Sequence, residues 1–404
     1  MQKTWKSLAG MMMLGAIVAG GMTSCKDDDD DNENNGWTAQ DVAINAAGIL
    51  DNYVDNVVFK TYNSLANSAE TLMDDVEKLS ESKTQVNLQK VCDEWKRARK
   101  YWEWSEAFLF GAAADYSIDP HIDTWPFDQT AFNQMMANFS KSEKAAKDSA
   151  IVIESVVTSQ NLTGFHAMEY VIFANGQARN VEEITDDELF FLQAVSEDLF
   201  LSSCRLEASW RAENKIAKSH LEILEDGEYY DSEKNEFGLS NYGEEFKNAG
   251  KAGSRYKSPT IALVQILEGA NDIIGEVRDA KIGSAVEGTN TEYIESPFSY
   301  NSIQDFYDNI ISCVHAIYGT MEITDGAQID KAASVAKSLN AYGMLTHTEA
   351  MKDVNTALVS ALAKIAAMKA PFVLNYTDES ARAAMEGLDP LEEAIDKMIE
   401  KLRE

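Results

Sequence analysis

A histidine and a glutamate stand three residues apart in the segment GFHAME at residues 164–169, and this pair is the most specific chemical signal in the sequence. Side chains at this spacing share one face of a helix, so His166 and Glu169 can both reach one ion. Imidazole nitrogen and carboxylate oxygen suit a borderline ion such as iron, zinc or copper, and Gly164 allows a tight turn just before them. A core histidine hydrogen-bonded to a neighbouring acid is the other interpretation, because one such pair is expected by chance in a chain of this composition.

Common catalytic motifs are absent from the sequence. It contains no HExxH pair of zinc peptidases, no G-x-S-x-G elbow, no phosphate-binding GxxxxGK[ST] loop and no GxGxxG turn after a strand. The common hydrolase and nucleotide-binding motifs are therefore not visible in this sequence.

Three further segments combine polar and aromatic side chains, namely residues 95–111, 119–126 and 295–305. In residues 95–111, Arg99 and Glu106 share one helical face, so they form either a charge pair inside a bundle or the wall of a polar pocket. The segment 119–126 follows and ends at Trp125 and Pro126.

The third segment, residues 295–305, leads into a predicted helix. There Ser302 and Asp305 have the spacing of a capping box, and free amides at this helix start could instead face a cavity.

Helical periodicity dominates the elements that must position these residues, and strand alternation is scarce. We predict an all-α fold of two up-and-down helical bundles, residues 37–230 and 231–404, with the link in the Gly- and Asn-rich stretch 226–257. The segment 111–127, with Pro120 and Pro126, is predicted to be an ordered loop. The predicted helices are 42–57, 86–110, 128–139, 143–157, 186–224, 258–280, 302–318, 330–346, 348–370 and 378–402.

The N-terminus predicts an exported lipoprotein. Lys3 and Lys6 precede a short apolar stretch, and residues 1–24 are interpreted as a signal peptide that is cut before Cys25, which then carries the lipid anchor. Residues 25–36 form an acidic tether. Lys26 and the aspartates after it form either a plain spacer or a signal for transfer to the outer cell surface. Without such a signal, the anchored protein would face the periplasm.

The charge balance limits the partners. Cleavage before Cys25 would remove two lysines and no acid, which changes the net charge from −32 to −34. Such an acidic chain repels nucleic acid and anionic lipid head groups, so we expect no nucleic-acid partner and assign membrane attachment to the acylated cysteine alone. The remaining cysteines, Cys92, Cys204 and Cys313, are odd in number and widely spaced, and are predicted to be core residues.

Three segments in this order, W…R…W..SEAF.FG, GxHxxE and SPFS.NS..D, resemble those of imelysin-like proteins, and the resemblance spans most of the mature chain. The resemblance implies two helical bundles with the GxHxxE residues near a cavity. Carried over by position, Gly164, His166 and Glu169 match that motif. Arg99, Glu106 and Trp125 lie in one of the other matching segments, and Ser299 and Asp305 lie in the third.

The family's link to iron acquisition and its classification among metallopeptidases leave two functions open. In the first, which we favour, an outer-membrane lipoprotein at the cell surface captures a metal ion or an iron-bearing small ligand, with an outer-membrane uptake partner. In the second, the protein is a metal-dependent peptidase, with iron or zinc held by His166, Glu169 and Glu106. A catalytic zinc typically has three protein ligands. The His166–Glu169 pair supplies two, and the sequence indicates no clear third ligand. A scaffold with a vestigial site is a third interpretation.

Replacing the anchor residue tests the export interpretation. Cys25→Ser is expected to release the protein from the membrane, because the acyl chains have no other attachment point. Neutral residues in place of 26–31 are expected to lower display on intact cells, measured by protease shaving. Unchanged surface accessibility would mean that the charged run is only a spacer.

Overall fold

Helices make up 71% of the computed structural model, and in the part of the chain that it describes the strands form two short hairpins. The structure describes residues 39–142, 162–288, 290–335 and 349–403. The all-α prediction is confirmed. No helix in these described ranges is long and apolar enough to cross a bilayer.

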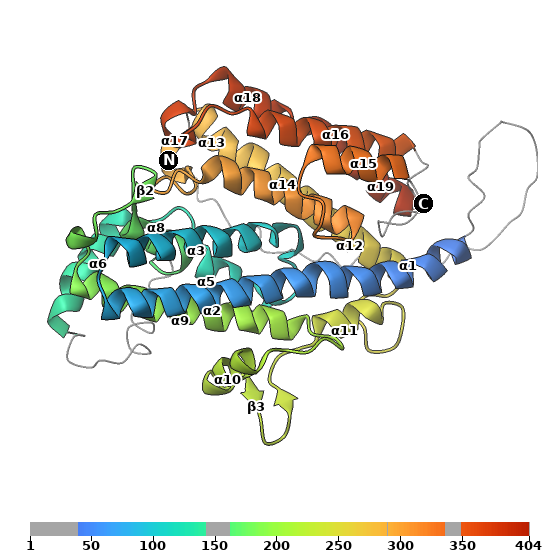
Figure 1. The fold of residues 1–404 in the computed structure, drawn as a ribbon. Coiled ribbons are helices and arrows are strands. Elements are labelled where there is room, and N and C mark those ends of the chain that lie inside the picture. Colours follow the sequence, from blue (N-terminus) through green and yellow to red (C-terminus); the bar gives the residue numbers. More distant parts are fainter. Residues whose placement is uncertain (1–38, 143–161, 289, 336–348, 404) are drawn as a thin grey trace, which may run out of the picture. The chain divides into compact units, whose positions relative to one another are not determined.

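The first described helices form one long helical rod. Helix α1 (Ala39–Tyr53) continues through a π-helical turn, η1 (Val54–Val58), into α2 (Phe59–Glu81). Its apolar residues recur every three or four positions, and α2 buries Tyr62, Leu65, Leu72 and Val76 against α3 (Gln85–Glu103) and α9 (Asp186–Ser209). Figure 1 shows these three long helices lying alongside one another.

Short elements connect α3 to α9. They are the 3-10 turn η2 (Glu106–Phe108), α4 (Ala112–Asp115), α5 (Asp119–Ile122), α6 (Gln129–Ser142), α8 (Gly164–Ile172), the hairpin β1 (Phe173–Ala174) and β2 (Gln177–Ala178), and the turn η3 (Val181–Glu183). The segment predicted as an ordered loop therefore contains two single-turn helices, and Pro120 lies in the first turn of α5, where no amide donor is needed. The predicted helix 143–157 lies outside the described residues.

The predicted helix 186–224 is wrong in its length. Helix α9 starts at the predicted place, with a capping box between Thr185 and Glu188, but it ends at Ser209. Trp210 is buried against Phe110, Tyr242 and Phe246, and tertiary packing therefore ends a helix that local sequence would have continued. The chain then turns back into α10 (Lys218–Asp226).

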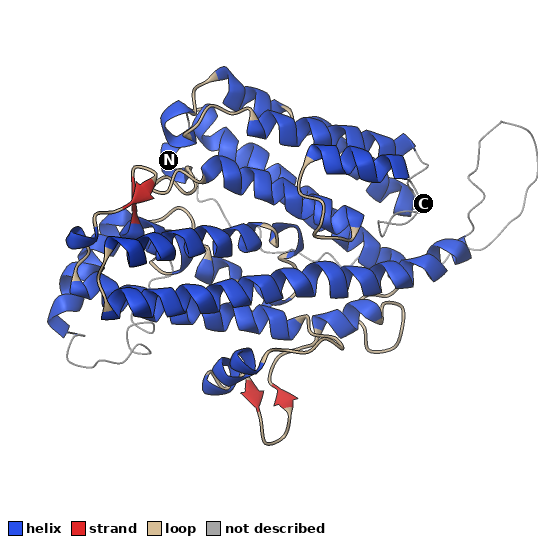
Figure 2. Ribbon diagram, viewed as in Figure 1, coloured by secondary structure: helices blue, strands red, loops and turns tan. Residues whose placement is uncertain are grey.

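A hairpin, β3 (Tyr230–Asp231) with β4 (Glu236–Phe237), and α11 (Tyr242–Lys247) follow. Figure 2 shows how little strand the described residues contain. The later helices pack on one another around α12 and α14. They are α12 (Pro259–Glu276), η4 (Val277–Ile282), α13 (Gly283–Val286), η5 (Thr291–Tyr293), α14 (Ser302–Tyr318), α15 (Gly326–Val335), α16 (Glu349–Ala366), α17 (Phe372–Asn375), α18 (Glu379–Glu386) and α19 (Asp389–Arg403).

Two predictions for this half need comment. The predicted helix 378–402 is split, because Pro390, which cannot donate an amide hydrogen bond, lies in the first turn of a separate helix, α19. Part of the predicted helix 330–346 lies outside the described residues. The two-bundle division at residues 230 and 231 stays a prediction. Residues Ala39–Glu404 cluster as one compact unit, in which α1 packs on α12 and α3 on α14.

Helix α14 carries a buried histidine that makes stability depend on pH. His315 Nε2 lies 3.1 Å from the Ile323 carbonyl oxygen, and burial outweighs this bond and lowers the pKa of His315 to about 3. Between pH ~6.5 and about 3, His315 therefore binds a proton in the unfolded chain but not in the folded chain. This contribution to stability is present above that pH and is lost as the pH falls toward 3.

Replacing His315 by glutamine isolates this effect, because glutamine can still donate to Ile323 and does not titrate. Between pH 7 and pH 5 the wild-type free energy of unfolding is expected to fall by roughly 1–2 kcal/mol more than that of His315→Gln. Urea unfolding at both pH values measures the difference. An equal fall in the free energy of unfolding of the two proteins between pH 7 and pH 5 would contradict this prediction.

Candidate functional site

Helix α3 places an arginine in the protein interior. Arg99 is fully buried, and two tryptophans on its side of the helix fix α3 against neighbouring segments. Trp95 Nε1 donates to the Phe165 carbonyl at 3.0 Å, and Trp102 Nε1 donates to Asp123 Oδ2 at 2.7 Å. Indole donors that bond across the interface thus set where the guanidinium lies.

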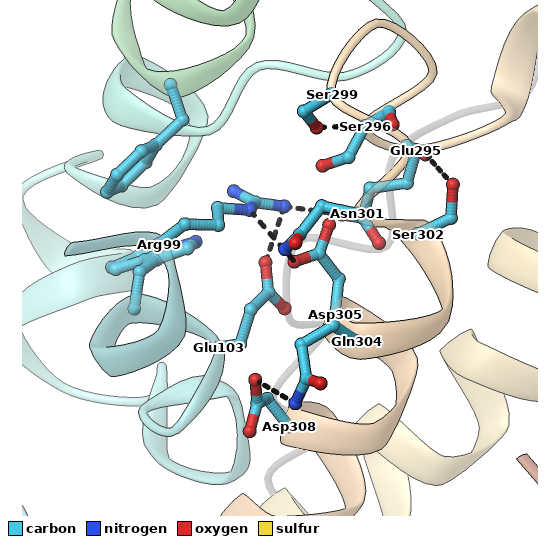
Figure 3. A network of polar contacts seen from close by, with 12 residues as sticks. Arg99, Glu103, Glu295, Ser296, Ser299, Asn301, Ser302, Gln304, Asp305 and Asp308 are labelled. Carbon is cyan, nitrogen blue, oxygen red and sulfur yellow. Dashed lines mark hydrogen bonds and ion pairs between the residues drawn. The ribbon is translucent and has the colours of Figure 1, made fainter. Parts of the chain in front are cut away.

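Four carboxylates surround the Arg99 guanidinium, and Figure 3 shows three of them, Glu103, Glu295 and Asp305. Nη2 lies 2.5 Å from Glu103 Oε1 and 2.7 Å from Glu295 Oε1, Nη1 bonds Asp123 Oδ1, and Nε lies 3.9 Å from Asp305 Oδ1. Burial disfavours the charged guanidinium, but these four acids outweigh it and raise the pKa of Arg99 well above its usual value. The acids come from α3, the segment after α5, the loop before α14, and α14 itself.

Gly164 brings the histidine to this cluster. Its φ is +72°, and a Cβ at this position would lie 2.0 Å from the carbonyl oxygen of Ile122. Only glycine fits such an approach of two backbones at positive φ. Helix α8 can therefore start directly beside the residue that precedes Asp123.

His166 lies between two acids. Its Nε2 is 3.2 Å from Asp123 Oδ1, and its Nδ1 is 3.4 Å from Glu169 Oε2. Burial alone would lower the pKa of His166, but its contacts with Asp123 and Glu169 outweigh burial and raise it to about 9. The imidazole is therefore protonated at neutral pH while no other cation replaces its proton.

Glu169 holds the histidine and is itself held by the loop before α14. Its Oε1 accepts hydrogen bonds from the Phe298 amide at 3.0 Å, the Ser299 amide at 2.8 Å and Ser299 Oγ at 2.7 Å. The loop has left-handed backbone at Ser296 (φ 46°) and Tyr300 (φ 59°). Such conformations in non-glycine residues persist where the surroundings hold them, and they cluster at functional sites.

Lys281 supplies a second buried cation. Its Nζ lies 3.1 Å from Glu295 Oε1 and 3.7 Å from Glu103 Oε2. It lies on the π-helical turn η4, a feature that is frequent at functional sites. These acids outweigh burial and raise the pKa of Lys281 well above its usual value.

Acids outnumber cations in this cluster, and several of the acids therefore have raised pKa values. Burial and like charges keep the pKa of Glu103 and Glu106 well above the usual range, and they raise that of Asp305 to about 7. Asp119, at the edge of the cluster, also has a pKa of about 7, from burial and then the charges of Asp123 and Glu276. Asp123 is the exception, because Arg99 and His166 outweigh its burial and hold its pKa far below the usual value.

Metal-ligand atoms meet at three places in the cluster. In each group, one ligand atom from every member lies within 4.8 Å of the others. The groups are Asp123 with His166 and Glu295, Glu103 with Glu106 and Asp123, and Glu103 with Glu295 and Asp305. Glu295 Oε2 is buried and has no hydrogen bond, so one carboxylate oxygen is free for a ligand. The donor set therefore fits a cation bound by nitrogen and oxygen ligands.

A sequence model of the family described as Imelysin matches residues 58–398. The chain belongs to the imelysin family. Iron-regulated protein A of Synechococcus elongatus is 25% identical over 260 residues, which is 64% of this chain and 61% of that protein. The chain thus spans about three fifths of the length of this relative.

Two solved structures have similar folds. One is described as an iron-regulated protein A precursor from Parabacteroides distasonis, with 25% identity, a TM-score of 0.70, and coverage of 89% of this chain and 95% of that chain. The other is an imelysin-like protein from Psychrobacter arcticum, with 14% identity, a TM-score of 0.56, and coverage of 87% and 93%. The second shows the fold alone. Two of these relatives are named iron-regulated proteins, and the family match places this chain among imelysin-like proteins.

The imelysin chain brings most of the residues predicted from its sequence to this cluster. Arg99, His166 and Asp305 lie in it, Glu169 and Ser299 bond each other beside it, and Gly164 makes the approach of α8 possible. Glu106 meets Glu103 and Asp123 rather than Arg99. Trp125 packs edge-on against Tyr293 at 4.9 Å, and Cys25 lies outside the described residues. The metal-ligand roles of His166, Glu169 and Glu106 stay predictions.

The predicted capping box of Ser302 and Asp305 is wrong. Asn301 is the N-cap of α14, and Asp305 accepts a bond from Asn301 Nδ2 at 2.7 Å while facing Arg99. Ser302 Oγ donates to the Glu295 carbonyl. The arginine's charge draws the Asp305 side chain into the cluster.

Sequence reasoning missed four members of the cluster. Glu103 follows Arg99 by four positions, so helical spacing could have indicated it. Asp123 and Glu295 lie inside segments already singled out, but nothing local distinguishes them from exposed acids. Lys281 has no signal in the sequence, because only the tertiary fold brings it to Glu295.

Gly164→Ala tests the close approach that carries His166. The added Cβ would strain a left-handed residue and collide with Ile122, so the free energy of unfolding is expected to drop by roughly 3 kcal/mol or more. Gly253→Ala is the matched control, since Gly253 also has positive φ (96°) but nothing lies within 4 Å of its Cβ position. That control should lose only about 1 kcal/mol. Equal losses in urea unfolding would refute the special role of Gly164.

Proposed function

We propose that this imelysin binds iron as its cargo, as a free ion or within a small chelate, through Asp123, His166 and Glu295. We also propose that it works as a lipid-anchored protein of bacterial iron acquisition. The observation that carries the proposal is the convergence of one imidazole and two carboxylates within 4.8 Å of one another in the interior. The names of its iron-regulated relatives support iron over other ions.

The charge of the cluster favours a cation. Six carboxylates face one arginine, one lysine and one histidine: Glu103, Glu106, Asp123, Glu169, Glu295 and Asp305. An added cation would neutralise the acids whose pKa values are now raised, and it would replace the proton of His166. Asp123, His166 and Glu295 would hold it, and Glu169 would orient the imidazole through Nδ1, as carboxylates commonly do behind a metal-bound histidine.

Burial favours binding over peptide cleavage. The side chains of His166, Asp123 and Glu295 are only 2%, 7% and 1% exposed. A catalytic metal needs an open position that a peptide carbonyl can reach, and these side chains leave little room for a polypeptide.

A metal-dependent peptidase remains the second candidate. Asp119 and Asp305, each with a pKa of about 7, have the proton affinity that a general base needs near neutral pH.

A surface pocket provides room for a chelate. It has a volume of about 770 Å³ and is lined in part by Phe127, Ile294, Pro297 and Phe298. Ile294 and Pro297 flank Glu295 and Ser296 in the chain, and the Phe298 amide bonds Glu169. An organic ligand in this pocket would contact the same loop that holds the His166 cluster.

The proposed location follows from the N-terminus. Acylated Cys25 would attach the protein to the outer membrane, at the cell surface according to the charged run after it. The acidic tether would separate the binding unit from the lipid. An uptake protein in the same membrane would then receive the iron.

Titration of purified protein with ferrous, ferric and zinc ions tests the binding site. His166→Ala is expected to weaken binding by well over tenfold, because it removes a direct donor, and Glu295→Gln by about tenfold. Because the imidazole must lose its proton, binding should strengthen as the pH rises toward about 9. His315→Gln is the control, since His315 is buried but lies in no group of metal-ligand atoms among the described residues.

A peptide-library digestion with the same samples separates the two candidates. Metal binding without cleavage supports the binding protein, and cleavage that is lost in His166→Ala supports the peptidase. If the wild type binds none of these ions and the variants only unfold earlier, the metal site is refuted.

A further inference from the structure

A second cluster of metal-ligand side chains lies between α9, α10 and α2. Cys204 and Glu207 are three residues apart on α9, so they share one face of the helix. His220 comes from α10, and its Nδ1 lies 2.6 Å from Glu207 Oε2. All three side chains are buried, and one ligand atom from each lies within 4.8 Å of the others.

The break after α9 creates this cluster. Because α9 ends at Ser209, the chain reverses and α10 packs back on α9. A continuous helix over 186–224 would place residue 220 about 20 Å beyond residue 207 along the axis. The turn instead puts His220 against Glu207, with Phe200 beside its ring at 5.6 Å.

One side of the imidazole is poorly satisfied. His220 Nε2 faces Glu70 Oε2 of α2 at 3.5 Å, which is too long for a good hydrogen bond, and the buried Nε2 makes none. The Glu70 side chain is 32% exposed, whereas His220 is buried. Asn63 Nδ2 donates to Glu207 Oε1 at 2.6 Å and fixes that carboxylate.

The thiol of Cys204 differs from the other two described cysteines. Cys92 Sγ donates to the Ile172 carbonyl at 3.5 Å, and Cys313 Sγ donates to the Ala270 carbonyl at 3.4 Å. Among the described residues, no hydrogen bond of Cys204 Sγ is present, although this side chain is fully buried. Cys204 therefore faces Glu207 and His220 with its sulfur uncommitted.

We propose that Cys204, Glu207 and His220 Nδ1 form a binding site for a thiophilic divalent cation, for which Zn²⁺ is the fitting ion, with Glu70 behind the imidazole at Nε2. One sulfur, one nitrogen and one carboxylate oxygen supply three of the four positions of a tetrahedral zinc site. With zinc–sulfur and zinc–nitrogen distances of about 2.3 and 2.0 Å, ligand atoms lie about 3.5 Å apart, so small side-chain rotations close the present arrangement. Phe200 shields the imidazole and Asn63 orients Glu207, as outer groups do at metal sites.

This site shares no residue with the Asp123–His166–Glu295 group, and it does not rest on the proposed iron binding. With Zn²⁺ present, the ion would join α9 to α10, which the His220–Glu207 contact already links. A metal held by both helices would stabilise the folded state in proportion to its binding free energy.

Cobalt and zinc titrations of the purified chain test the site. Co²⁺ bound by a thiolate gives a near-ultraviolet charge-transfer absorption, which is expected in the wild type and absent in Cys204→Ser. Zn²⁺, measured by competition with a chromophoric chelator, should remove that absorption and raise the wild-type melting temperature. His220→Gln is expected to bind Zn²⁺ at least tenfold more weakly.

The matched control is Cys92→Ser, which makes the same change at another buried cysteine outside the cluster and should keep the absorption. His166→Ala should also keep it, so this test does not depend on the iron site. If Cys204→Ser does not fold by circular dichroism, His220→Gln decides the result. Absence of the cobalt absorption in the folded wild type, or unchanged Zn²⁺ affinity in His220→Gln, would overturn the proposal.

Discussion

Neutralising the buried charge of Arg99 is the constraint that organises this structure. A guanidinium that is fully removed from water is tolerated only if acids pair with it and bond its donors. Those acids come from separate parts of the chain, so satisfying one side chain forces α3, the segment after α5, the loop at Glu295 and α14 to meet. Removing one acid from such a buried network typically destabilises a protein by about 3–5 kcal/mol, since a charge is left uncompensated.

The cluster contains more acid than that constraint requires. Asp123, Glu103 and Glu295 pair closely with Arg99, Glu295 also pairs with Lys281, and Glu106 and Asp305 add acids whose raised pKa values show poor compensation. Natural proteins place such locally unfavourable arrangements at functional sites and offset them with stability elsewhere. Here the offset comes from a continuous apolar core and from the aromatic packing of Trp95 and Trp210.

Local periodicity predicted the helices well where packing agrees with it and poorly where packing overrides it. Helix α14 begins and ends at the predicted residues, and α9 begins at the predicted residue Asp186, because the apolar spacing that indicates them is local. The end of α9 could not be predicted, since it depends on Trp210 leaving the helix to pack against Phe110 and Phe246, which come from distant parts of the chain. The same holds for the site. The spacing of His166 and Glu169 marks them in the sequence. Glu295 and Lys281 join the site only because α14 and η4 pack against α3.

Glu169 links the histidine to the protein surface. One of its oxygens faces His166, and the other accepts three hydrogen bonds from Phe298 and Ser299. The carboxylate cannot rotate without losing bonds on one side or the other, so the orientation of the imidazole and the position of the loop are coupled. Phe298 also lines the surface pocket, and Gly176 donates its amide to the Phe298 carbonyl at 2.8 Å, which ties the loop to the β1–β2 hairpin. A ligand that changes the imidazole therefore acts on the pocket wall through one side chain, and a ligand in the pocket acts on the imidazole by the same route.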